Sequence, residues 1–115
     1  MKSLADLVGD LVKATEEDKI KWKQDSVDTY ETSLSGDYSV VVWEWSDPET
    51  DERGITAQLM RRHTILDAIR SDHYGVSYSN LQRLYNVARR SANNIDEAID
   101  VISGLLKSLK PARDG

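Results

Sequence analysis

The chain has 115 residues, the size of one ordinary domain with one hydrophobic core, and we predict a single domain over residues 1–115. It contains no cysteine, which excludes a disulfide framework, a zinc ribbon and thiol catalysis, and which agrees with a cytoplasmic location. The N-terminus lacks the pattern of a signal peptide, and no segment approaches the ~20 apolar residues of a membrane span. We therefore expect no membrane partner.

Charge is unevenly distributed along the chain. The net charge is -5: residues 1–60 carry 14 acidic and 6 basic side chains, whereas residues 61–115 carry 6 acidic and 9 basic ones. Nonspecific binding of DNA or RNA depends on neutralising phosphates, so we expect no direct nucleic-acid partner. The acidic half could meet a basic protein, or it could only keep the protein soluble.

The first third of the chain predicts a helix followed by strands. Apolar residues in residues 3–15 recur at the spacing of one helical stripe, formed by Leu4, Leu7, Val8, Leu11 and Val12. Residues 19–23 alternate charged and apolar side chains, which predicts an amphipathic strand. A second strand over residues 27–34 and a third over 38–45 flank Ser35-Gly36-Asp37, so these segments predict a hairpin.

The middle of the chain continues the meander. Residues 46–54 are polar and contain Pro48 and Gly54, which predicts a long, mobile hairpin loop. Residues 55–60 alternate as a fourth strand. Residues 64–70 fit either a helical turn or a short strand, and we favour a fifth strand.

The C-terminal segment keeps a heptad spacing over nearly thirty residues. Nine residues follow alternating intervals of four and three, namely Leu81, Tyr85, Ala88, Ala92, Ile95, Ile99, Ile102, Leu106 and Leu109. Asn93-Asn94 could interrupt the helix, but the stripe keeps its phase across them, so we predict one continuous helix. The predicted fold is α+β: an antiparallel β-meander of four to five strands, flanked by a short N-terminal helix and a long C-terminal helix.

Three segments carry a resemblance: KIKWK, the hairpin around LSGDYSVVVWEW, and LYNVARRSANNIDEAIDVISGLL. On these segments the chain is similar to a loosely defined group of small bacterial proteins without assigned activity. The resemblance implies the same order of elements, a short helix, a Lys-Ile-x-Trp strand, a meander and a helix with an LYxxARR start. It implies no functional residue.

Candidate catalytic and metal-binding patterns are weak. His63 and His73 lack the spacing that puts two ligands on one helical face. Asp47, Glu49 and Asp51 resemble the first half of a calcium loop, but the bidentate Glu that should follow is missing. No glycine-rich phosphate loop or nucleophile elbow is present. We predict no metal, no cofactor and no catalytic residue.

Candidate interaction residues lie on surfaces. The acidic loop of Asp47, Glu49, Asp51 and Glu52 could contact a basic partner. Trp43 and Trp45 share one strand face and suit an interaction patch, although we expect at least two of the three tryptophans, Trp22 included, to pack in the core. The arginines Arg61, Arg62, Arg70, Arg89 and Arg90 could gather into a site for an anion or an acidic partner, or pair with local carboxylates.

The long helix suggests the function. If the meander cannot cover the whole heptad stripe, the remainder must find another chain, most simply a second copy in a homodimer. We therefore predict a non-enzymatic protein-interaction or assembly module of unknown partner. The alternatives are an acidic inhibitor or accessory protein, encoded by a mobile element, that blocks a nucleic-acid-binding protein, and a small-ligand binder or cryptic enzyme.

Overall fold

The computed structural model of this chain describes residues 2–109. These residues form three helices and five strands, and the α+β prediction is confirmed. The elements are α1 (Leu4–Glu16), β1 (Lys23–Ser26), β2 (Thr29–Ser33), β3 (Tyr38–Asp47), β4 (Glu52–Arg61), β5 (Thr64–Asp72), α2 (Tyr78–Ala92) and α3 (Ile95–Ser108).

The five strands form one antiparallel meander in the order β1-β2-β3-β4-β5. β3 and β4 pair over ten residues, from Tyr38 opposite Arg61 to Asp47 opposite Glu52. The loop predicted over 46–54 is therefore shorter than expected, because β3 extends to Asp47 and β4 begins at Glu52, which leaves residues 48–51 as the turn. The end of a hairpin is open to solvent on both faces, where charged side chains can belong to strands without being buried. The fifth strand is confirmed as β5.

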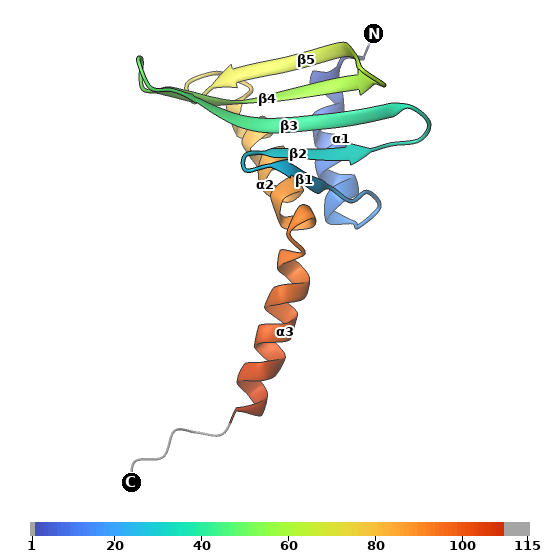
Figure 1. Cartoon of the computed structure of the whole chain (residues 1–115), viewed down its shortest axis with the longest axis vertical. Coiled ribbons are helices and arrows are strands. Elements are labelled where there is room, and N and C mark those ends of the chain that lie inside the picture. The colour runs from blue at the N-terminus through green and yellow to red at the C-terminus, as the bar shows by residue number, and fades with distance from the viewer. Residues whose placement is uncertain (1, 110–115) are drawn as a thin grey trace.

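α1 and α2 cover one face of the sheet and leave the other face open (Figure 1). α1 begins at a capping box, in which the Ser3 backbone N–H donates to Asp6 Oδ2 at 2.8 Å. α1 packs against α2, and α2 lies across the strands. The buried apolar core between the layers consists of Leu4, Val8, Val12, Trp22, Tyr30, Val40, Val42, Ile55, Ala57, Leu81, Leu84, Tyr85 and Ala88.

The strand predicted over 19–23 begins later than expected. Residues 19–22 lead into β1 without forming ladder bonds. Their backbone is held by side chains: the Trp22 N–H donates to Ser91 Oγ in α2 at 3.0 Å, and the Lys21 carbonyl accepts from Thr32 Oγ1 at 2.7 Å. Trp22 itself is buried, and its Nε1 donates to Thr15 Oγ1 at 3.0 Å. The alternating pattern indicates correctly that one side of residues 19–22 is buried. The backbone of this segment, however, hydrogen-bonds to side chains and not to the backbone of a neighbouring strand.

The C-terminal helix is not continuous, so that prediction is wrong. α2 ends at Ala92, the Asn93 N–H donates to the Arg89 carbonyl at 3.0 Å, and Asn94 has φ 51° and ψ 43° in the left-handed region. Asn adopts this conformation more readily than most residues, which lets the chain change direction here. α3 consequently runs away from the two-layer body (Figure 1), and the molecule measures 66 Å along its longest axis.

Candidate interaction surfaces

α3 carries the largest group of exposed apolar side chains on the described chain. Six of them are 52–65% exposed, and together we call them the arm stripe: Ile99, Val101, Ile102, Leu105, Leu106 and Leu109. None of the residues of α3 is buried. Monomeric proteins seldom leave a contiguous stripe of this kind in water, so the arm stripe is a candidate interface.

The surroundings of α3 do not account for its stability. Among residues 2–109, the only element it packs against appreciably is α2, and Figure 1 shows it extending free of the sheet. An isolated helix of ~12–15 residues is marginal in water, because most helical stability in proteins comes from burying an apolar face. The 14 residues of α3 therefore lack the packing that a helix of this length normally needs.

The polar side of α3 is asymmetric in charge. Asp96, Glu97 and Asp100 occupy its first half, whereas Lys107 lies in its last turn. Asp96 pairs with Arg90 of α2 across the joint between the helices. Lys107 has Ser103 and Gly104 one turn before it, so it has no carboxylate neighbour at those positions of its own helix.

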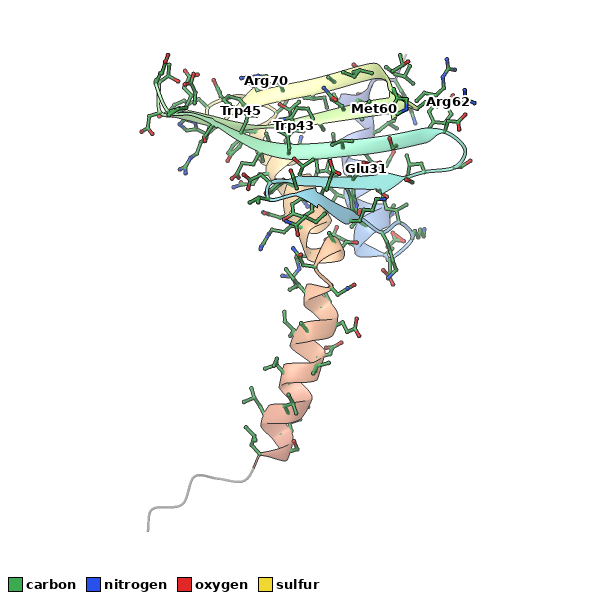
Figure 2. All side chains as sticks on the ribbon, in the orientation of Figure 1. Glu31, Trp43, Trp45, Met60, Arg62 and Arg70 are labelled. Atoms are coloured by element: carbon green, nitrogen blue, oxygen red, sulfur yellow. The ribbon has the colours of Figure 1, made fainter. Side chains whose placement is uncertain are left out.

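The open face of the sheet is a second surface. Figure 2 shows Trp43, Trp45 and Arg70 on this face, from β3 and β5. The Arg70 guanidinium lies 3.9 Å from the centroid of the Trp45 ring, a cation–π arrangement. Trp22 is the only fully buried tryptophan, since Trp43 and Trp45 are half-buried on this face. Our expectation that at least two tryptophans would be in the core was wrong.

Gly54 allows the Trp45 ring to lie on the sheet. The two residues are cross-strand partners in the β3–β4 pair, and a Cβ atom at Gly54 would lie 2.5 Å from Trp45 Cζ2. From the sequence alone, Gly54 is interpreted only as a turn residue. Its contact with the Trp45 ring can be recognised only once the register of β3 and β4 is known. Two nearby buried atoms, Trp45 Nε1 and Thr56 Oγ1, have no hydrogen-bond partner among residues 2–109.

The acidic residues of the predicted loop lie at the tip of the β3–β4 hairpin. Asp47 Oδ1 accepts from the Glu49 N–H at 2.9 Å, and the Asp51 N–H donates to the Asp47 carbonyl at 2.9 Å. Asp51 has φ 60°. Asp47 therefore shapes the turn, while Glu49, Asp51 and Glu52 are exposed at its end.

The predicted arginines have different partners. Arg62 Nε lies 3.0 Å from Asp37 Oδ2, joining the β4–β5 turn to the β2–β3 turn. Arg90 pairs with Asp96, and Arg70 covers Trp45. Arg61 and Arg89 are exposed. Pairing with local groups thus accounts for three of the five.

The two histidines and one buried tyrosine are the titratable groups that a reactive site could use. His63 is exposed in the β4–β5 turn, and His73 Nδ1 lies 3.1 Å from the Arg53 carbonyl. Burial raises the pKa of Tyr85 to about 12, with further contributions from Tyr30, Glu44 and Asp28. No group of three or more His, Asp or Glu residues within 2–109 is arranged to hold a metal ion.

A groove of about 750 Å³ lies where the ends of α1 and α2 meet the start of α3. Its charged lining is mostly acidic and consists of Glu16, Asp18, Lys21, Arg90, Asp96, Glu97 and Asp100. Arg83 and Glu16 form an ion pair at 3.6 Å beside it. The groove marks the joint between body and arm, and the arm stripe is not part of its lining.

No family model, curated protein or solved structure matches this chain. Within residues 2–109, no helix combines the length and apolar character needed to cross a membrane.

Proposed function

We propose that this chain is a non-enzymatic assembly module that associates through the arm stripe of α3. The observation that carries the proposal is a helix that projects from the body with six large apolar side chains more than half exposed. Covering such a stripe removes apolar surface from water and supplies the packing that stabilises a helix. The two-layer body would then hold α3 in place, and the other surfaces of the body would be exposed on the outside of the assembly.

Energetics favour the arm stripe over the charged surfaces as the main contact. Fully burying one Ile or Leu side chain contributes about 1.5–3 kcal/mol, so burying the exposed half of several such residues offers a substantial free energy of association. An exposed ion pair contributes only ~0–1 kcal/mol. The acidic hairpin tip and the arginines would therefore tune the affinity and the rate of association, but they would contribute little of the association free energy.

The test compares two double variants of the full chain. Ile102→Gln/Leu106→Gln places polar helix-forming residues in the arm stripe, and Glu97→Gln/Ser108→Gln places the same residue on the polar side of α3 as the matched control. Light scattering and sedimentation over a concentration series should show wild type and control associating. The arm-stripe variant should lose about 2–4 kcal/mol of association free energy and sediment as a monomer.

Near-UV circular dichroism of the tryptophans should be unchanged in both variants, because Trp22 is buried in the body and, within residues 2–109, α3 packs appreciably against α2 alone. If the arm-stripe variant associates as wild type does, or if wild type is a monomer at every concentration, the proposal is wrong.

A further inference from the structure

The arrangement of side chains around α3 says which partner covers the arm stripe and in which direction it runs. We propose that the occupant is α3 of a second copy of this chain, packed antiparallel, with its twofold axis near Gly104. This inference rests on the proposed association through α3.

The exposed stripe is symmetric about one point. Ile95 is half-buried at the joint with the body, so the available heptad residues are Ile99, Ile102, Leu106 and Leu109. These four positions are mirrored about residue 104. If a second copy of α3 packs antiparallel with its residue 104 at the same level, Ile99 lies opposite Leu109 and Ile102 lies opposite Leu106. Each exposed heptad residue thus meets an apolar residue of the second copy.

The two sides of the stripe differ, and the difference selects an orientation. At about 100° per residue, Ala98 and Leu105 lie beside the heptad line on one side, and Asp96 and Ser103 lie beside it on the other. In a parallel pair, each side of one helix faces the opposite side of its partner, which would set the polar side with Ser103 against the apolar side with Ala98 and Leu105. In an antiparallel pair, the apolar side of one helix faces the apolar side of the other, and the polar side faces the polar side. Leu105 then meets its counterpart close to the axis.

Other occupants fit less well. The polar side of α3 has three carboxylates and one lysine, which an anionic lipid surface would repel. Antiparallel pairing also holds the two bodies at opposite ends of a common two-helix rod, with their Ile95 residues about 27 Å apart along it. The assembled protein would be an elongated dimer that displays two copies of the open sheet face.

Cysteine cross-linking tests the orientation directly, because the natural chain contains no cysteine. Two full-length variants, Ile99→Cys and Leu109→Cys, are treated with a short bismaleimide, each alone and as a mixture. In the antiparallel dimer, position 99 meets position 109 of the partner, whereas like positions are about 15 Å apart along the rod. A cross-linked dimer should form in the mixture and be largely absent from each variant alone.

Cross-linking of each variant with itself would establish a parallel pair and overturn this inference while leaving association through α3 intact. Absence of any cross-link in a sample that light scattering shows to be dimeric would also overturn it, by placing the contact elsewhere. A sample that is monomeric throughout, for wild type as well, would overturn the proposed function together with the inference.

Discussion

α2 and α3 are two consecutive helices of similar length that carry one heptad pattern, yet their apolar faces have opposite environments. Four apolar residues of α2 are buried, because α1 and the sheet lie against them: Leu81, Leu84, Tyr85 and Ala88. In α3 the equivalent face is open, and Leu106 is 64% exposed. A periodic pattern therefore indicates that a face must be covered, but it does not say whether the cover belongs to the same chain.

The difference is decided at Asn93 and Asn94. The left-handed Asn94 turns the chain so that α3 runs outward with its own direction. The body can thus complete its core with α2 and leave α3 free for another contact.

The largest expected effect comes from making the same truncation in both helices. Leu84→Ala removes a fully buried side chain and should lower the free energy of unfolding by about 3 kcal/mol. Leu106→Ala removes the same atoms from an exposed position and should change the free energy of unfolding of the monomer by less than about 0.5 kcal/mol.

Urea unfolding followed by tryptophan fluorescence, at concentrations too low for association, measures both changes. Equal losses from Leu84→Ala and Leu106→Ala would mean that α3 packs on its own body, and the contrast between the helices would be wrong.

A smaller effect follows from the titratable group buried against α2. Burial raises the pKa of Tyr85 in the folded state from 10.0 to about 12, so the unfolded chain loses this proton first as the pH rises. The contribution of Tyr85 to stability is therefore fully present below pH 10 and is lost between pH 10 and 12, by roughly 2–3 kcal/mol.

Unfolding free energies of wild type and Tyr85→Phe, measured from pH 9 to 12, isolate this contribution from the other groups that titrate there. The wild-type curve should fall more steeply than that of the variant. Parallel curves would show that Tyr85 is not held neutral by the body. The arm-stripe variant should follow wild type, since the body is unchanged in it.

The sequence predicted the elements whose patterns are local. The stripe of α1, the turn residues before β3, the alternation in β4 and the helical period from Leu81 onward all depend on side chains a few residues apart, so their types were correct. The boundaries were less accurate where a tertiary partner intervenes. Trp22 is buried without a ladder because Ser91, 69 residues away, accepts its N–H.

Of the candidate surfaces, the arm stripe could be predicted in outline and the open sheet face could not. The heptad residues and the surplus of apolar area are visible in the sequence. The contact between Arg70 and Trp45, and the place of Gly54 beneath that ring, depend on the register of three strands. The break between α2 and α3 depends on the left-handed backbone conformation of Asn94. It could not be predicted, because the heptad spacing continues without interruption across this residue.

The smallest expected effect tests that joint. Asn94 has φ 51°, a conformation that costs an ordinary L-residue roughly 1–2 kcal/mol but that glycine adopts freely. Asn94→Ala should therefore shift the joint toward a straight helix by about 1 kcal/mol, since alanine also has the highest helix propensity. Asn94→Gly is the matched control and should keep the wild-type direction of the arm.

Spin labels at Ser35→Cys in the β2–β3 turn and Gly104→Cys on the polar side of α3 would report the direction, with labelled chains diluted into unlabelled ones so that only distances within one chain are measured. Both positions are exposed, and a side chain at Gly104 would meet no atom within 4 Å. The alanine variant should give a second distance population that the glycine variant lacks. Identical distance distributions in all three proteins would mean that the backbone preference of residue 94 does not set the direction of α3. Packing around the joint, including the Arg90–Asp96 pair, would then set it.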